Sequence, residues 1–357
     1  MKLTDKTLKR MKTLTELHGA PGFEDQVRDY LRTEFEALGA EIITDGLGGI
    51  FAVKKSKNED APVAMIAAHM DEVGFMVTEI QDNGLIKFIP LGGWSKDVLL
   101  SQKMKLRTKD NKEITGVIGS VPVHFRRGDS STTEIKDMLF DVGADSKDEV
   151  YEMGIELGDS IVPDVKFEIM ENSKKLLAKA WDNRYGCLIA LEVLEELKDT
   201  ELDCHLYVGA NVQEEVGLRG AKVSSNLIKP DIAFVVDCSP ANDMMGKKND
   251  TGQLGKGTLI RIMDRTMILR KNMREFLLET ADKNNVDYQY YTSPGGTDAG
   301  SIHVSNEGVP SAVVGICSRY IHTSHSIINY EDYLNAKTLL TELVKEVNSK
   351  KIELLKR

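Results

Sequence analysis

Four short, nearly all-apolar segments constrain the fold of this chain most strongly. They span residues 62–68, 206–212, 232–236 and 311–316. Runs of this kind are typical of strands that are buried in the middle of an α/β sheet. Between them, residues 22–39 and 188–197 carry apolar side chains at helical spacing. The alternation predicts an α/β domain in which a mixed sheet is flanked by helices.

The pattern changes in the segment that follows the first of these strands. From about residue 74 to residue 159, short β-rich runs are separated by turn sequences such as Asp82-Asn83-Gly84 and Gly92-Gly93. Closely spaced strands with such turns are typical of a small barrel or sandwich. The polar run at residues 130–133 predicts a loop. We therefore expect two domains, a discontinuous one formed by residues 1–70 and 160–357, and an inserted β-rich one formed by residues 71–159.

Charge and hydropathy argue against several classes of protein. The chain has 56 acidic and 46 basic residues and a formal net charge of −10, whereas a nucleic-acid surface needs clustered basic charge. No apolar run approaches the ~20 residues of a transmembrane helix, and the first residues show no signal-peptide pattern. The four cysteines lack CxxC spacing and mostly lie beside apolar runs. We therefore expect a cytoplasmic protein with buried free thiols and with no nucleic-acid or membrane partner.

Side chains that can bind metals follow the apolar runs. His69 follows the first run, Glu214-Glu215 follows the second, and Asp237 follows the third. His322 lies a few residues beyond the fourth run. Ligands of open α/β sheets collect at the carboxyl ends of the strands. We therefore expect these side chains to meet at one edge of the sheet.

The adjacent glutamates place a demand on the backbone. Neighbouring side chains of an extended chain point to opposite sides, so Glu214 and Glu215 reach one site only if the chain turns, and Gly217 permits a turn. Two carboxylates this close resist joint ionisation unless a cation is near. The alternative for such a pair, taken alone, is an exposed surface position.

Two aspartates complete the candidate set, and each has a simpler alternative. Asp71 lies two residues after His69, a spacing that suits a carboxylate orienting a metal-bound imidazole. The alternative is that His69 is an ordinary hydrogen-bonded histidine. Asp182 begins a predicted helix, where the alternative role is that of an N-cap.

The combined set of side chains suits two metal ions. Zinc binds imidazole nitrogen and carboxylate oxygen, and two histidines, two aspartates and one glutamate are too many ligands for one tetrahedral ion. They fit two ions bridged by a carboxylate, with the second glutamate free to accept a proton from water. We expect two divalent ions, with zinc first and cobalt or manganese as alternatives, since the same ligand types accept all three.

Five ordered motifs resemble those of the glutamyl, deblocking and tetrahedral aminopeptidases. They lie at residues 68–74, 181–184, 213–221, 236–238 and 319–322. Residues 45–50, 92–94 and 295–299 are further shared stretches, and the resemblance covers essentially the whole chain. It is closest to bacterial glutamyl members. The resemblance implies a dinuclear zinc exopeptidase-like catalytic domain with an inserted PDZ-like or small-barrel dimerisation domain, and a metal-dependent aminopeptidase activity.

The resemblance also implies how the ligands are divided between the ions. Asp182 bridges the two ions in this scheme. His69 and Asp237 complete one site. Glu215 and His322 complete the other site. His322 ranks above the nearby His325, because the family's ligand directly follows the Tyr-Ile pair at residues 320–321.

The two remaining acidic residues have catalytic and orienting roles in this scheme. Glu214 is the general base, which takes a proton from water and later gives it to the leaving amine. Asp71 orients His69 through the free ring nitrogen.

The substrate side follows less directly from these motifs. The closest relatives imply a preference for N-terminal Glu and Asp, and hence a basic residue in the pocket. Arg265 is the candidate, together with Gly296 and Thr297 of the glycine loop. Further basic candidates are Lys256, Arg270 and Lys179.

Several alternatives to an acidic preference stay open. They are a broad-specificity, leucine-type or deblocking aminopeptidase, a deacylase or carboxypeptidase on the same scaffold, and a metal-free scaffolding protein. The family also implies dimers assembled into tetrahedral dodecamers through the inserted domain. The expected partners are therefore short peptides and further copies of the chain.

Overall fold

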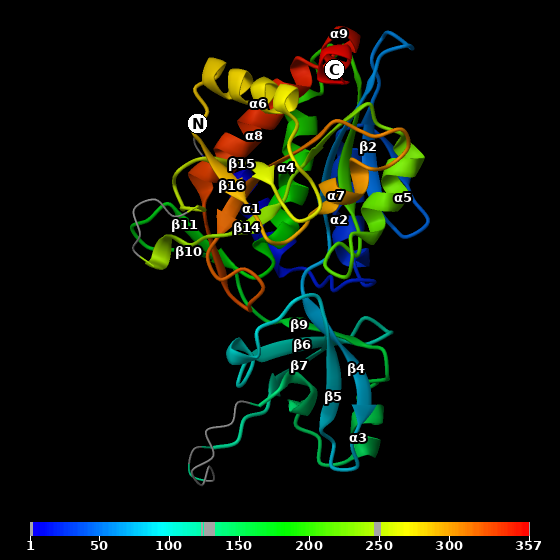
Figure 1. Cartoon of the computed structure of the whole chain (residues 1–357). Coiled ribbons are helices and arrows are strands. Elements are labelled where there is room, and N and C mark those ends of the chain that lie inside the picture. The colour runs from blue at the N-terminus through cyan, green and yellow to red at the C-terminus, as the bar shows by residue number, and fades with distance from the viewer. Residues whose placement is uncertain (1–2, 123, 125–132, 246–250, 357) are drawn as a thin grey trace.

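The structure is a computed structural model that describes residues 3–122, 124, 133–245 and 251–356. It has two lobes, an α/β domain and a smaller β-barrel (Figure 1). The barrel follows β3 (Val63–His69), and the chain returns to the α/β domain after β9 (Ser160–Pro163). The expected α/β fold with an inserted β-rich unit is confirmed.

The large sheet is mixed, as the sequence predicts. Its main path runs in the order β1 (Glu41–Thr44), β2 (Ile50–Lys54), β12 (His205–Asn211), β3, β13 (Ile232–Val235), β17 (Ser311–Ser318), β15 (Thr258–Met263) and β16 (Tyr288–Thr292), and β14 (Cys238–Pro240) pairs with β17. Strand β3 lies in the centre and is parallel to β12 and to β13. In contrast, β2 is antiparallel to β12, and β15 is antiparallel to β17. The carboxyl ends of β12, β3, β13 and β17 therefore share one edge.

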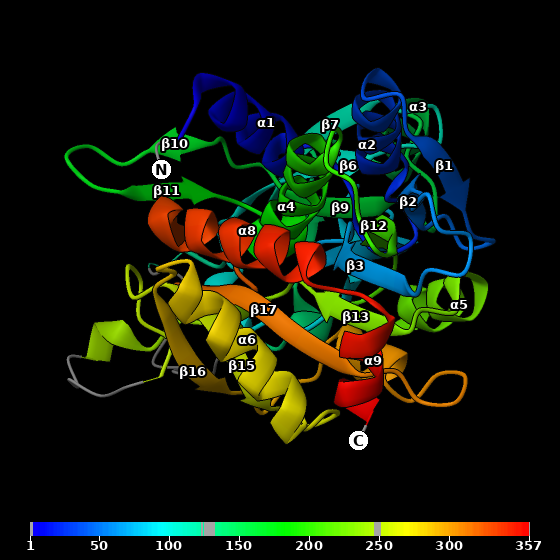
Figure 2. The ribbon, with the colours of Figure 1, turned by 90° about the horizontal axis from the view of Figure 1, so that it is seen from above.

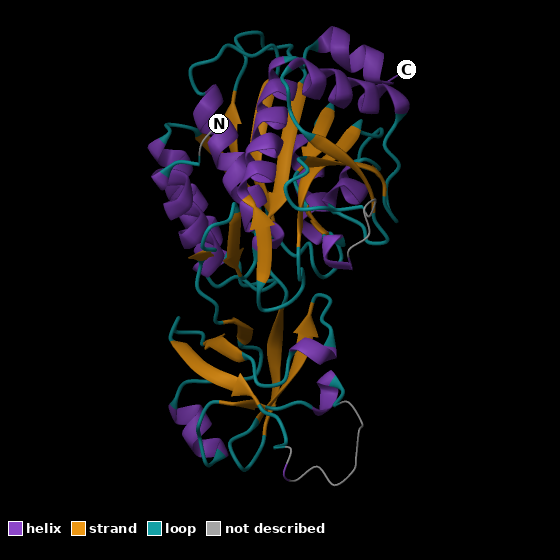
Figure 3. Ribbon diagram, turned by 90° about the vertical axis from the view of Figure 1, so that its left-hand side faces the viewer, coloured by secondary structure: helices purple, strands orange, loops and turns teal. Residues whose placement is uncertain are grey.

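Helices cover both faces of this sheet (Figure 3). One face carries α1 (Asp5–Glu16), α2 (Asp25–Ala37), α4 (Trp181–Leu197), α6 (Lys271–Lys283), α8 (Tyr330–Lys345) and α9 (Ser349–Lys356), and the other carries α5 (Arg219–Ile228) and α7 (Asp298–Ile302). Helices α4 and α8 pack side by side (Figure 2). Side chains of β3 alternate between the two cores, with Ala64 and Ile66 in one and Met65 and Ala67 in the other. Burial on both faces explains why this strand is apolar throughout.

The inserted unit is a closed antiparallel barrel. Its strands follow the order β4 (Gly74–Ile80), β5 (Ile86–Leu91), β8 (Phe140–Asp141), β7 (Glu113–Ile118), β6 (Lys103–Arg107) and β9, and α3 (Lys147–Glu152) lies beside them. Strand β9 closes the barrel, since it pairs with both β4 and β6. The domain limits of 71–159 stay a prediction; the barrel strands themselves run from residue 74 to residue 163. Of the loop predicted at 130–133, residues 130–132 lie outside the described residues.

One strand of the large sheet was not among the predicted elements. It is β15, at residues 258–263, and it is followed by α6, which begins at Lys271. The segment between them turns because Asp264 Oδ1 accepts hydrogen bonds from the backbone N–H groups of Thr266 and Met267. A small second sheet is formed by β10 (Glu168–Ile169), β11 (Lys175–Ala178) and β18 (Ser326–Asn329).

The thiol and membrane expectations can both be compared with the structure. Cys187, Cys204, Cys238 and Cys317 are all buried and free, as expected. Among the described residues, no helix combines the length and the apolar character that crossing a membrane requires.

Candidate metal centre

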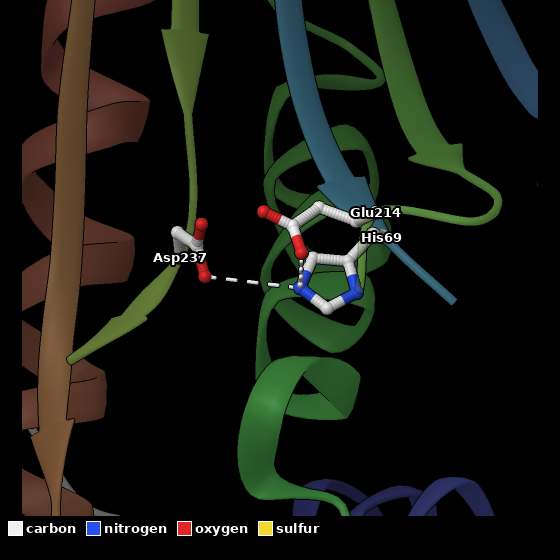
Figure 4. Close-up of side chains that lie close together, drawn as sticks. All are labelled: His69, Glu214 and Asp237. Atoms are coloured by element: carbon white, nitrogen blue, oxygen red, sulfur yellow. Dashed lines mark ion pairs between the residues drawn. The ribbon is translucent and has the colours of Figure 1, made fainter. Parts of the chain in front are cut away.

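The structure gathers the predicted ligands into two adjacent clusters. His69, Glu214 and Asp237 form the first cluster (Figure 4). Asp182, Glu215 and His322 form the second cluster. Within each cluster, one potential ligand atom per residue lies within 4.8 Å of the others. These residues come from the ends of β3 and β13, from the start of α4, and from the loops that follow β12 and β17.

Asp182 connects the two clusters. Its Oδ1 lies 3.2 Å from His69 Nε2, and its Oδ2 lies 3.3 Å from His322 Nε2. His69 Nε2 is also 3.8 Å from Asp237 Oδ1, and His322 Nε2 is 3.3 Å from Glu215 Oε2. Each carboxylate oxygen of Asp182 therefore faces a different histidine, which is the arrangement that a bridging ligand requires.

The local backbone explains how Asp182 reaches this position. Its φ and ψ of −82° and 105° are not helical, and Ala180 before it is left-handed with a φ of 53°. The next residue, Asn183, donates from Nδ2 to Val236 O at 2.6 Å, which ties the start of α4 to β13. The N-cap of α4 is Ala180 rather than Asp182, and both carboxylate oxygens of Asp182 face histidines.

A turn after β12 separates the two glutamates. Gln213 has a φ of 54°, Gly217 has a φ of 124° and Leu218 has a φ of 56°. The N–H groups of Glu214 and Glu215 donate to Asp71 Oδ1 and Oδ2, each at 3.0 Å. The turn therefore begins at Gln213, before the two glutamates, and also includes Gly217. It directs the side chains of Glu214 and Glu215 to different clusters.

Asp71 therefore contacts both the turn and His69. The Nδ1 atom of His69 lies 3.1 Å from the backbone O of Asp71 and 3.5 Å from its Oδ1. The closer contact is with the backbone carbonyl, which leaves the carboxylate to the two glutamate amides. The predicted orienting role of the Asp71 carboxylate toward His69 stays a prediction.

The charges in these clusters favour a bound cation. Burial raises the pKa of Glu215 to about 8, with a further contribution from the charge of Asp182. Burial also raises the pKa of Glu214 and of Asp237. Burial acts in the same direction on Asp182, but hydrogen bonds from His322 and His69 outweigh it and lower the pKa of Asp182. Buried carboxylates at this density repel one another unless positive charge compensates them.

The donor set also fits divalent metals in its chemistry. Its six side chains offer imidazole nitrogens and carboxylate oxygens, which are the ligand atoms that zinc, cobalt and manganese accept. Glu215 Oε1 is buried and has no hydrogen-bond partner, so a ligand position is free on that carboxylate. The residues present therefore fit the expected pair of ions.

A cavity of about 330 Å³ opens onto the clusters. Its lining includes Asp182, Glu214, Glu215, Asp237 and His322, together with Arg261 and residues 293–296. The cavity has room for an amino-acid side chain next to the candidate metal ligands.

The predicted substrate residues lie at different distances from this cavity. Gly296 lines it, and Thr297 is buried next to Gly296. Arg265, Lys256 and Arg270 are exposed and are not part of its lining. Lys179 is buried elsewhere, where its Nζ contacts Glu72 Oε1 and Leu17 O.

Arg261 was missed by the sequence analysis, although it is the arginine that lines the cavity. It lies on β15 and is 2% exposed. Its Nη1 contacts Asp264 Oδ2 at 3.2 Å, its Nη2 donates to Ser239 Oγ at 2.7 Å, and its buried Nε has no partner. The run Thr258-Leu259-Ile260-Arg261-Ile262-Met263 could have indicated a strand carrying this residue.

Comparison with known proteins gives a consistent set of matches. The sequence profile of the M42 glutamyl aminopeptidases matches residues 48–339. The glutamyl aminopeptidase of Lactococcus lactis subsp. cremoris is 47% identical, over 100% of this chain and 99% of that protein.

Solved structures are similar over nearly the full length. The TET aminopeptidase of Thaumarchaeota archaeon SCGC AB-539-E09 has a TM-score of 0.94 and 36% identity, covering 99% of this chain and 100% of that one. The Pyrococcus horikoshii TET1 peptidase, described as assembling into a tetrahedron or a large octahedral shell, has a TM-score of 0.87 and 26% identity, covering 95% and 99%.

Proposed function

This chain belongs to the M42 glutamyl aminopeptidase family, and on that basis we propose that it uses two metal ions to remove glutamate and aspartate from the N-termini of short peptides. Peptidases of this family are metal-dependent aminopeptidases. The number of ions, the residues that hold them and the acidic preference are the proposed parts.

The proposed ligands divide between two ions that share Asp182. His69 and Asp237 would hold one ion, and Glu215 and His322 would hold the other. The division is supported by the positions of the two Asp182 oxygens, one near each histidine. When bound, two divalent ions lower the pKa of the attacking water and polarise the scissile carbonyl.

Glu214 is the proposed general base. Its carboxylate lines the cavity, and its Oε2 lies 4.0 Å from His69 Nε2, farther than the oxygens of Asp182 and Asp237. Glu214 would accept a proton from the attacking water and pass it to the leaving amine. Burial raises the pKa of Glu214, which favours uptake of a proton by its carboxylate.

The acidic preference rests on one observation, the position of Arg261. The guanidinium side chain lines the same cavity as the candidate metal ligands, and its Nε has no partner. Arginine binds carboxylates with a fixed fork of N–H donors. A substrate with an N-terminal Glu or Asp side chain would place its carboxylate against this group.

Initial rates on aminoacyl p-nitroanilides test this function. Glu, Asp, Leu, Lys and N-acetyl-Glu substrates would be compared after chelation and again after zinc or cobalt is restored. We expect metal-dependent cleavage of the Glu and Asp substrates and no cleavage of N-acetyl-Glu. A strong preference for Leu would contradict the acidic pocket, and release from N-acetyl-Glu alone would favour a deacylase.

We also propose a cytoplasmic tetrahedral dodecamer. The P. horikoshii TET1 peptidase, which assembles into a tetrahedron or an octahedral shell, supports the assembly. The four free, buried thiols support a reducing compartment. Light scattering coupled to size exclusion tests the assembly, because a 39.7 kDa monomer and a dodecamer differ widely in mass.

A further inference from the structure

We propose that the loop Gly92-Gly93-Trp94 of the inserted barrel positions His322 for metal binding. This inference rests on the proposed function, because it takes His322 as a metal ligand. It gives the barrel a direct part in the metal centre, in addition to any part in assembly.

The loop follows β5 and lies against two members of the second cluster, Glu215 and His322. The ring of His322 lies against the backbone of Gly93. A Cβ at Gly93 would lie 3.3 Å from His322 Nδ1 and 3.8 Å from its Cε1. A Cβ at Gly92 would lie 3.3 Å from Glu215 Cβ and 2.7 Å from Val73 Cγ1. The two glycines thus allow the barrel backbone to approach these ligands closely.

His322 needs such a contact more than His69 does. The side chain of His69 is 2% exposed and that of His322 is 37% exposed. His69 has a backbone carbonyl from its own strand end, Asp71 O, 3.1 Å from Nδ1. A metal-binding imidazole is held in one tautomer and one orientation by a partner of its second nitrogen. For His322, the backbone of Gly93, which belongs to the other domain, lies beside Nδ1 in the position of such a partner.

Trp94 attaches the loop to the barrel. Its Nε1 donates to Gly74 O at 3.2 Å. Its ring stacks on Phe75, with centroids 4.9 Å apart and an interplanar angle of 25°. Phe75 is fully buried in the barrel core. The position of Gly93 is therefore set by packing within the barrel, and not by the α/β domain alone.

The variant Gly93→Ala tests this inference directly. The backbone at Gly93 is outside the left-handed region, so alanine can adopt it, and its only close neighbour at the new Cβ is the His322 ring. We would titrate zinc into chelated protein by calorimetry and record the visible spectrum of the cobalt form. We expect one of the two ions to bind ~10–100-fold more weakly, because the added methyl group displaces the His322 ring and disturbing the support of a metal ligand has effects of this size. The other ion should bind as in the wild type.

Two further variants make the result specific. Gly119→Ala also adds a methyl group in the barrel, but there the new Cβ meets only Leu139 O at an ordinary 3.5 Å, so both affinities should be unchanged. Trp94→Phe keeps an aromatic stack on Phe75 and removes the bond to Gly74 O. It should weaken the binding of the same ion. If Gly93→Ala does not fold, Trp94→Phe tests the inference in its place.

Each outcome has one meaning. If the wild-type protein binds no zinc, the proposed function fails, and the inference fails with it. If the wild type binds two ions and Gly93→Ala binds both with unchanged affinity, the proposed function stands and the inference is overturned. Equal weakening of both ions would also overturn it, because that result indicates a general change in the fold.

Discussion

Asp182 presents one carboxylate oxygen to each of two histidines and so connects the two clusters. Around it, burial raises the pKa values of three carboxylates, so the cluster holds negative charge only with a compensating cation. Glu214 and Glu215 are adjacent in sequence but belong to different clusters. At the residue scale, the same side-chain type is therefore expected to serve two functions, proton transfer and metal binding.

Substitution of the glutamates should separate these functions. Glu214→Gln is expected to lower kcat by about 10²-fold or more while both ions stay bound, since a positioned general base contributes about 10²–10⁴-fold. Glu215→Gln is expected to lose one ion. Metal analysis of both purified variants, together with rates on the Glu substrate, provides the check. Near wild-type turnover of a fully loaded Glu214→Gln enzyme would contradict the assignment.

Arg261 should determine the preference for acidic substrates. Arg261→Gln is expected to lower kcat/KM for the Glu substrate about 10–100-fold, since a hydrogen bond to a charged group contributes about 1.5–3 kcal/mol, and to leave the Leu substrate nearly unchanged. Arg274→Gln, on the exposed face of α6, is the matched control. Arg265→Gln tests the candidate from the sequence, and loss of the preference in that variant alone would contradict the role of Arg261.

At the scale of elements, the turn after β12 places the two adjacent glutamates in different clusters. The left-handed residues Gln213, Gly217 and Leu218 reverse the chain within a few residues. Asp71 follows β3, and its carboxylate accepts hydrogen bonds from the backbone N–H groups of both glutamates. It therefore joins the ends of the neighbouring strands β3 and β12. The turn is therefore held by its partner strand as well as by its own sequence.

Removal of this support should be visible in stability. Asp71→Ala leaves two amides without their partner, and we expect the free energy of unfolding to fall by ~1–3 kcal/mol or more. Asp71→Asn keeps one acceptor oxygen and should lose less. Chemical denaturation of the metal-free proteins measures both, which excludes any contribution from bound ions. An unchanged midpoint for Asp71→Ala would contradict this role.

At the scale of the whole molecule, the candidate metal centre lies where the two lobes meet. Ligands come from the strand ends of the α/β domain, and the loop after β5 of the barrel lies against them. The barrel is also attached by Arg107 of β6, whose Nη1 donates to Asp25 of α2 at 2.8 Å. Changes in the centre are therefore expected to affect the stability of the whole chain.

Chelation should make that stability depend on pH. The pKa of Glu215 is raised to about 8 and that of His322 to about 9 in the metal-free fold. Between pH 6.5 and about 8 both groups bind more protons in the folded than in the unfolded protein, so stability should fall as pH rises across that range. Burial lowers the pKa of His18 from its ordinary value of 6.5, so this group changes the stability only below pH 6.5. Thermal melts of chelated and zinc-loaded protein test this, since the loaded form should not lose stability over that range.

Local sequence determined the fold class, because burial on both faces requires uninterrupted apolar strands, and it also indicated most of the side chains that form the two clusters. His69, Glu214 and Asp237 each follow such a strand directly, so the rule that parallel strands end at one edge was enough to group them. Asp182, at the start of a predicted helix, and His322, a few residues beyond the fourth run, were in the predicted set from their positions, and the family motifs then supported both.

Only the tertiary structure decided which side chains meet. Arg261 and Gly93 lie far along the chain from the ligands that they approach, and neither residue type indicates a function by itself. Their positions depend on the pairing of β15 with β17 and on the packing of the barrel loop. Contacts of this kind are made between distant segments, and the spacing of residues along one chain does not contain them.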